Sequence, residues 1–234
     1  MIGEIKEKFF LVGHRGASAY ELENTMKSFR RAFEMGCDAV EMDLRRTKDD
    51  EIVVIHDEDL SRVAKVNLKV REVSLRELKG IQLINGESVP TLEEVLSQFN
   101  GKNLFLEIKE KGFEGKLVEL VKREKMLDNV LFISFDYESL KKVSDLGGKY
   151  IGLLFFKPPF PIEEGRKIKA FSLLPRVNLV NPRNVKIMKK GFTVITWVVN
   201  DPTQLRRAKE SGCNGFVTDK PDISKEEKSL EKFV

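Results

Sequence analysis

The sequence predicts an α/β protein, a (β/α)8 TIM barrel with a short insertion after its second strand. Eight short runs rich in Val, Ile, Leu and Phe alternate with helical segments, and no long linker interrupts them. Eight such strands are typical of a closed barrel. An open sheet would carry a glycine-rich phosphate loop after its first strand, but HRGASA has one glycine there. The predicted strands are 9–13, 38–44, 104–109, 130–135, 150–156, 170–174, 192–199 and 214–218.

Helical periodicity appears between these strands, and the segments have the end residues that helices favour. Several begin with Thr or Pro and stop at Gly. A ninth apolar run, IVVIHD at 52–57, is predicted to form a hairpin with the second strand, and the insertion is expected at about 57–90. We expect one domain over 1–234. The predicted helices are 25–36, 91–99, 115–125, 137–148, 182–191 and 202–212.

Composition and charge exclude several classes of protein. The chain is 41% hydrophobic and 33% charged, as a folded soluble protein is. It has no run of 18 apolar residues that could span a membrane and no signal peptide, which predicts a cytoplasmic location. Lys and Arg number 41 against 37 Asp and Glu, and the two signs are interleaved. Nucleic acid is therefore not an expected partner.

Two cysteines lie in matching phrases, Cys37 in MGCDAVEMD and Cys213 in SGCNGFVTD. Each phrase reads as the end of a helix followed by a strand. In a closed barrel these strands, the second and the eighth, flank the first strand. Two strand spacings are about 9 to 10 Å, which is too far for a disulfide. We expect free, buried thiols.

Acidic residues occur within two predicted strands. The period of two in DAVEMDL puts Glu41 and Asp43 on the face toward the barrel interior, and LFLEIK does the same for Glu107 and Lys109. Three carboxylates held close repel one another unless a cation or raised pKa values relieve them. Hard oxygen donors favour one divalent cation, Mg²⁺ or Ca²⁺. The alternative is an internal ion-pair network.

The chain has two histidines, and each follows a predicted strand beside the acidic cluster. His14 precedes Arg15 in HRG, and His56 ends IVVIH. Imidazole suits proton transfer near neutral pH, and arginine offers a two-pronged donor to a phosphate or carboxylate. The alternatives are a structural role for either histidine and a surface ion pair for Arg15.

With these residues in view, the chain resembles the glycerophosphodiester phosphodiesterase family. The family usually has Pro where this chain has Leu22, and often threonines in place of Val63 and Ala64. The resemblance runs in order over nearly the whole chain, and its first half is the most specific. It rests on HRG at 14–16, ENT at 23–25, GCDAVEMDLRRTKDDEIVVIHDEDLSR at 36–62, VPTLEEVL at 89–96, LEIK at 106–109, SF at 134–135, WVVN at 197–200 and TDKP at 218–221.

The resemblance implies a barrel that hydrolyses glycerophosphodiesters, which are small molecules, to glycerol 3-phosphate and an alcohol with a divalent cation. By matching positions, Glu41, Asp43 and Glu107 would hold the metal, His14 and His56 would act as acid and base, Arg15 and Lys109 would bind phosphate, and Trp197 would line the pocket. The alternative for Trp197 is that it is a core aromatic residue of a strand.

The resemblance also implies an order of proton transfers. The 2-hydroxyl of the glycerol would attack phosphorus, with His14 as the first-step base and His56 as the first-step acid, and water would open the resulting cyclic phosphate. Two alternatives stay open. FFKPPF at 155–160 could favour a lysophospholipid, as in a lysophospholipase D, and a non-catalytic barrel could bind metal or phosphate. The headgroup, the ion and the oligomeric state stay open.

Overall fold

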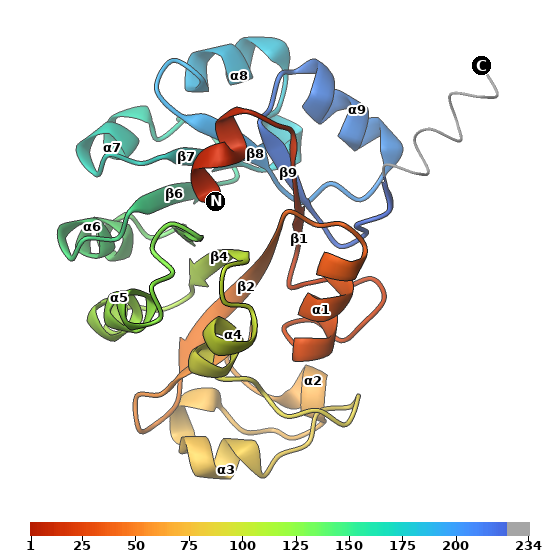
Figure 1. Cartoon of the computed structure of the whole chain (residues 1–234), viewed down its shortest axis with the longest axis vertical. Coiled ribbons are helices and arrows are strands. Elements are labelled where there is room, and N and C mark those ends of the chain that lie inside the picture. Colours follow the sequence, from red (N-terminus) through yellow and green to blue (C-terminus); the bar gives the residue numbers. More distant parts are fainter. Residues whose placement is uncertain (224–234) are drawn as a thin grey trace.

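A computed structural model of the chain describes residues 1–223. Over this range nine strands form one sheet, and eight of them run parallel and close into a ring as β9 pairs with β1 and β1 with β2. The helices lie outside the ring (Figure 1), so the predicted barrel is confirmed. The strands are β1 (Phe10–Gly13), β2 (Ala39–Arg46), β3 (Ile52–Val54), β4 (Asn103–Ile108), β5 (Val130–Ser134), β6 (Tyr150–Phe155), β7 (Ser172–Pro175), β8 (Thr193–Thr196) and β9 (Gly215–Thr218).

All six predicted helices are present, as α1, α4, α5, α6, α8 and α9. Their ends follow the capping residues: the Thr25 side chain accepts from the Ser28 backbone, and Thr91 forms a capping box with Glu94. In the part of the chain described, no helix is long and apolar enough to cross a membrane. The helices are α1 (Met26–Glu34), α2 (Ser61–Ala64), α3 (Leu75–Lys79), α4 (Leu92–Gln98), α5 (Glu114–Arg123), α6 (Tyr137–Asp145), α7 (Ile162–Lys167), α8 (Pro182–Met188) and α9 (Pro202–Glu210).

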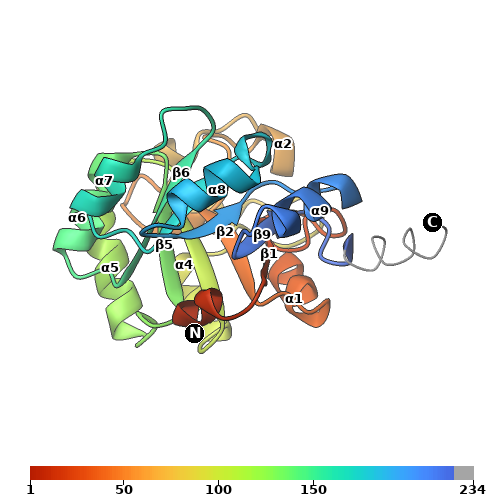
Figure 2. The same ribbon diagram turned by 90° about the horizontal axis from the view of Figure 1, so that it is seen from above.

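The sequence did not predict α2, α3, α7 or the first element, the 3-10 helix η1 (Ile2–Lys6). Each is short, and four to six residues hold too little periodicity to distinguish a helix from a loop. Ile2 and Ile5 are nevertheless fully buried against interior side chains of the barrel such as Phe10. Figure 2 shows η1 at the opposite end of the barrel from α2. The N-terminal segment therefore closes the end of the barrel that is remote from the insertion.

The ninth run forms the predicted hairpin. β3 pairs antiparallel with β2, with Leu44 opposite Val54. The residues after β3 form the insertion, which contains α2, the 3-10 helix η2 (Val70–Glu72) and α3. It has its own hydrophobic cluster, made of Val53, Ile55, Leu60, Val63, Val70, Val73, Leu78, Leu83 and Val89. The insertion is thus a small packed unit next to the end of β3.

The alternation along β2 divides its side chains as predicted. Val40, Met42 and Leu44 are fully buried in the layer between sheet and helices. The intervening Glu41 and Asp43 belong to the interior face, at 3% and 0% exposure. Carboxylates are rarely this deeply buried without a partner or a function.

The two cysteines precede β2 and β9, the strands on either side of β1. Both thiols are free and buried, as expected. Burial raises the pKa of Cys37 and of Cys213 to about 12, so both stay protonated at neutral pH.

Candidate active site

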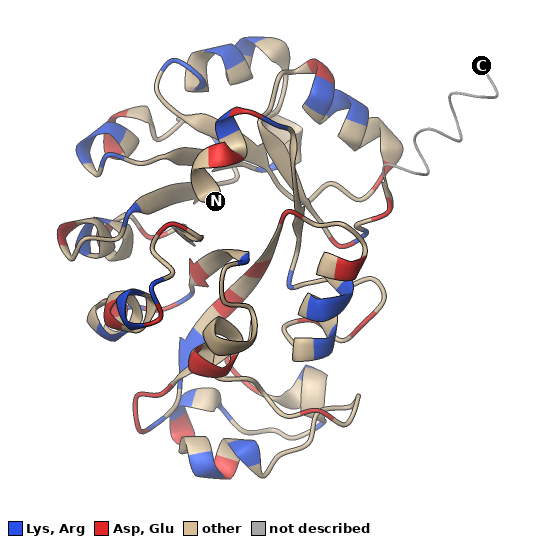
Figure 3. Ribbon diagram, viewed as in Figure 1, with Lys and Arg blue, Asp and Glu red and all other residues tan. Residues whose placement is uncertain are grey.

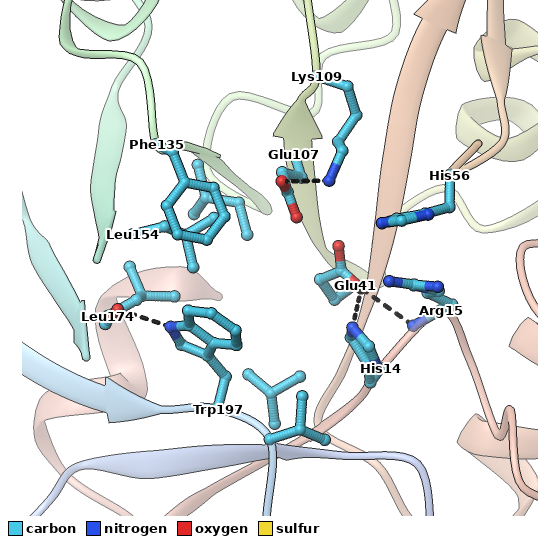
Figure 4. A pocket seen from close by; sticks show the side chains of 13 residues that line it. His14, Arg15, Glu41, His56, Glu107, Lys109, Phe135, Leu154, Leu174 and Trp197 are labelled. Carbon is cyan, nitrogen blue, oxygen red and sulfur yellow. Dashed lines mark hydrogen bonds and ion pairs between the residues drawn. The ribbon is translucent and has the colours of Figure 1, made fainter. Parts of the chain in front are cut away.

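A cavity of about 230 Å³ opens at the carboxyl ends of the barrel strands. This end of a (β/α)8 barrel is where its active sites lie. Figure 4 shows charged and imidazole side chains on one side of the cavity and apolar side chains on the other. The lining residues are His14, Arg15, Glu41, His56, Glu107, Lys109, Ile133, Phe135, Leu154, Leu174, Trp197, Val198 and Val217.

Three acids form a cluster beside the cavity, and two of them, Glu41 and Glu107, line it. Asp43 of β2 and Glu107 of β4 are directly opposite in the parallel register, and Glu41 lies two residues before Asp43 on the same face. One carboxylate oxygen from each lies within 4.8 Å of the other two. Red segments on β2 and β4 in Figure 3 mark the acidic residues of these two neighbouring strands. The structure therefore brings the three predicted metal ligands together.

Two oxygens of this cluster lack a hydrogen-bond partner although they are buried, Glu41 Oε1 and Asp43 Oδ1. Such groups are uncommon in folded proteins and call for an explanation. A divalent cation that prefers oxygen ligands, such as Mg²⁺ or Ca²⁺, would satisfy both. The donor set therefore fits a metal ion.

Electrostatics of the cluster lead to the same interpretation. Burial and the nearby charge of Asp43 raise the pKa of Glu41 to about 8, and the same two causes raise the pKa of Glu107. Burial also acts to raise the pKa of Asp43, but Arg15 and Lys109 hold it below its usual value. A proton on Glu41 thus relieves the repulsion in the metal-free site, and a cation would replace it.

Asp43 is held by three side chains. Arg15 Nε lies 3.1 Å from Asp43 Oδ2, and Lys109 Nζ lies 3.4 Å from Oδ1 and 2.8 Å from Glu107 Oε1. The Asn24 amide donates to Oδ2 at 2.8 Å and accepts from the Asp43 backbone at 3.2 Å. Asn24 adopts φ 56°, a left-handed conformation that asparagine tolerates better than most residues. Arg15 and Lys109 therefore pair with the acids of the cluster, and both side chains also line the cavity.

His14 follows β1 and is oriented by a residue that follows β9. Its Nδ1 lies 2.7 Å from Asp219 Oδ1, and its Nε2 lies 4.0 Å from Glu41 Oε2. Ser18 and Asn200 side chains donate to Asp219. Burial favours neutral His14, but the Asp219 hydrogen bond and the Glu41 charge outweigh it and raise the pKa of His14. Because Asp219 accepts from Nδ1, the nitrogen available for proton transfer is Nε2.

His56 has the same arrangement on the insertion side. Its Nδ1 lies 2.7 Å from Asp57 Oδ1, and the Arg45 guanidinium donates to the His56 backbone oxygen at 2.8 Å. Its ring points into the cavity beside Arg15 (Figure 4). The two histidines thus both present Nε2 toward the acidic cluster.

Trp197 directly follows β8 and lines the cavity while packing on the interior core. Its Nε1–H donates to the Leu174 backbone oxygen at 2.8 Å, which fixes the ring. Phe135 packs edge-on against Trp197 with ring centres 5.5 Å apart, and the ring centre of Phe156 lies 6.0 Å from that of Phe135. Phe135 and Phe156 are 45% and 51% exposed, so an aromatic strip leads from the cavity to the surface.

Seven of the eight predicted site residues line the cavity, and Asp43 does not line it but belongs to the same acidic cluster as Glu41 and Glu107. The sequence assigned no role to several residues that contact these side chains directly or through one further residue. The signal was present, because each lies inside a quoted motif: Glu23 and Asn24 in ENT, Asp57 in HDEDLSR, Phe135 in SF, Asn200 in WVVN and Asp219 in TDKP.

A (β/α)8 barrel whose mouth combines an acidic cluster, two carboxylate-bound histidines and two cationic side chains defines the class of phosphodiester-hydrolysing enzymes. The chain belongs to the glycerophosphoryl diester phosphodiesterase family, whose family model matches residues 14–223.

Several known proteins are similar over nearly their whole length. A glycerophosphodiester phosphodiesterase from Caldanaerobacter subterraneus is 32% identical, with 92% of this chain and 96% of the relative covered. A human lysophospholipase D is 28% identical over 94% of this chain and 87% of the relative. The structure of an Oleispira antarctica phosphodiesterase with its product sn-glycerol-3-phosphate covers 95% of this chain and 96% of its own, at TM-score 0.80 and 25% identity.

Proposed function

We propose that the protein hydrolyses glycerophosphodiesters to glycerol 3-phosphate and an alcohol, with two histidines as acid and base and one divalent cation. The observation that carries this proposal is the pair of histidines, each with a carboxylate on Nδ1, beside one acidic cluster. Binding alone would not require two such matched groups. Family membership supports the same substrate class.

The residues that would hold the cation are Glu41, Asp43 and Glu107. Two buried oxygens without a hydrogen bond, Glu41 Oε1 and Asp43 Oδ1, support this assignment, and an all-oxygen donor set suits both Mg²⁺ and Ca²⁺. When bound, the cation offsets negative charge on the phosphoryl oxygens. Arg15 and Lys109 line the cavity beside the cluster, and each keeps donors beyond those used for the acids, so both suit phosphate binding.

We propose the following proton transfers, which the positions of the two rings support. In the first step the glycerol 2-hydroxyl attacks phosphorus, His14 Nε2 takes its proton, the bond to the alcohol oxygen breaks, and His56 protonates that oxygen. In the second step water opens the cyclic phosphate and the two roles reverse. His14 is 19% exposed beside Glu41, whereas His56 is 32% exposed, which favours His56 as the donor to a departing alcohol.

The test measures glycerol 3-phosphate released from glycerophosphocholine and glycerophosphoethanolamine. We expect activity with Mg²⁺ or Ca²⁺, its loss in EDTA, and its return when the ion is restored. Unchanged activity in EDTA would remove the metal from the mechanism. No release from any diester, together with tight cation binding, would instead support a non-catalytic metal- or phosphate-binding barrel.

A second candidate substrate, a lysophospholipid, is favoured by the aromatic strip Trp197, Phe135 and Phe156. Such a strip would bury part of an acyl chain, and the similar human protein is a lysophospholipase D. The test compares kcat/KM for lysophosphatidylcholine and glycerophosphocholine in wild type and Phe156→Ala. A selective loss on the lysolipid would support this substrate. Ile84→Ala is the control, since Ile84 is an apolar residue of similar exposure, 58% against 51% for Phe156, and lies outside the aromatic strip.

We also propose that the chain acts on its small-molecule substrate as one domain, in the cytoplasm. The closed barrel and the insertion packed beside it support a single unit. Residues 224–234, which the predicted domain 1–234 includes, lie outside the described residues.

A further inference from the structure

Two loops from different parts of the chain meet beside the cavity through a continuous set of ion pairs. His56 Nδ1 lies 2.7 Å from Asp57 Oδ1, and Arg62 Nε donates to Asp57 Oδ2 at 2.7 Å. Arg62 donates through both terminal nitrogens to Glu23, at 2.7 and 2.8 Å. Arg15 donates to the same Glu23 at 2.9 Å. His56 is thereby connected to Arg15 although 41 positions separate them along the chain.

Arg62 is suited to this position by its shape. All three guanidinium nitrogens are used, one on Asp57 and two on Glu23. The planar, rigid arrangement of these donors fixes both carboxylates at once, which a lysine ammonium cannot do. Burial acts to raise the pKa of Asp57, but Arg62 and His56 outweigh it and lower the value to about 2. Asp57 therefore stays ionised and keeps accepting from His56.

The backbone around these ion pairs is held by apolar packing. Val63, directly after Arg62, is buried in the hydrophobic cluster of the insertion, and Ala64 and Leu22 pack against that cluster. These three residues are the positions at which the sequence departs from the usual family pattern. The loops would therefore stay docked if the Arg62 side chain were lost.

We propose that Arg62, paired with Glu23, is a positioning residue that sets where His56 stands relative to Arg15. This inference rests on the proposed function, in which His56 donates a proton and Arg15 binds phosphate. The Arg62 side chain is 47% exposed, so its ion pairs contribute little to the stability of the fold. Catalysis is more demanding, because a misplacement of about 1 Å can cost about 100-fold in rate.

The first test compares Arg62→Ala with wild type on glycerophosphocholine and on the 4-nitrophenyl ester of glycerol phosphate. On the choline ester we expect kcat to fall by roughly 10- to 100-fold with KM little changed, since Glu23 still holds Arg15. On the nitrophenyl ester, whose leaving group needs little protonation, we expect a loss of less than about threefold. Equal losses on both substrates, or no loss on either, would overturn the proposal.

The second test repeats Arg62→Ala in a His56→Ala background. If Arg62 acts through His56, the second substitution adds no further loss on glycerophosphocholine. Additive losses would overturn the inference. Arg71→Ala is the matched control: Arg71 also belongs to the insertion, is 43% exposed and pairs with Asp50 away from the cavity. It should leave both activities unchanged.

Two further variants keep the outcome decisive. If Arg62→Ala does not fold, Arg62→Gln replaces it in the same comparisons. Glu23→Gln should raise KM on both substrates, because it also removes the charged partner of Arg15. A wild-type protein that turns over neither substrate would overturn the proposed function. Normal wild-type turnover with a silent Arg62→Ala would overturn only the role of Arg62.

Discussion

The two histidines of the site have the same carboxylate contact but different surroundings. The carboxylate that orients His14, Asp219, follows a barrel strand and accepts from the neutral side chains of Ser18 and Asn200. His56 stands at the edge of the insertion, where charged side chains hold its carboxylate near the surface. One of the two proposed proton-transfer groups therefore depends on closure of the barrel, and the other depends on a docked insertion.

Removing His14 should have the largest effect. As the proposed first-step base it is needed whatever the leaving group, so His14→Ala should lower kcat by roughly 10²- to 10⁴-fold on both glycerophosphocholine and the 4-nitrophenyl ester. Steady-state kinetics on the two substrates measure this. A variant that keeps normal activity on the nitrophenyl ester would exchange the roles of the two histidines.

Removing His56 should lower activity by different amounts on the two substrates. His56→Ala should lose about as much as His14→Ala on glycerophosphocholine, but much less on the nitrophenyl ester, because nitrophenolate leaves without a proton. The ratio of the two kcat values is the measurement. Equal losses would mean that His56 does not protonate the leaving group.

Smaller effects should come from the residues that orient the rings. Asp219→Asn and Asp57→Asn each leave a neutral partner on Nδ1, and each should lower kcat by about 10- to 100-fold. Only Asp57→Asn should spare the nitrophenyl ester. The pair of variants is compared by kcat on both substrates, and an identical pattern for the two would remove the distinction between the histidines.

The last prediction concerns stability in place of rate, and it tests the surroundings of His14, since Glu41 lies 4.0 Å from that ring. The pKa of Glu41 is about 8 in the fold and 4.5 in the reference state, so the folded metal-free protein binds the extra proton between these values. The free energy of unfolding should therefore fall as pH rises through this window, by up to roughly 1.4 kcal/mol per pH unit.

Denaturant unfolding in EDTA at several pH values measures this slope. Glu41→Gln should flatten it and should not destabilise the metal-free fold at pH about 8. Added Mg²⁺ or Ca²⁺ should stabilise wild type more at high pH than at low pH, because the ion competes with the proton. The same slope in Glu41→Gln as in wild type would mean that another group causes it.

Much of the site follows from local pattern. The period of two along β2 and β4 places Glu41, Asp43 and Glu107 inside the barrel, because the other face of each strand is apolar and covered by helices. Neighbouring parallel strands then bring the acids together in register. The eight parallel strands and the β3 hairpin were predictable for the same reason, whereas η1 and α7 were too short to show a period.

The amino-acid sequence by itself determined the barrel, the inward acids and the placement of both histidines after strands. Only the tertiary structure decided which side chains contact the histidines and the partners of the histidines. Asp219 contacts His14, 205 positions away in the sequence, because β9 pairs with β1, and Glu23 contacts Arg62, 39 positions away. The physical reason is that hydrophobic periodicity is a local property of the chain. Hydrogen bonds and ion pairs between distant loops exist only once the strands have closed and the insertion has packed.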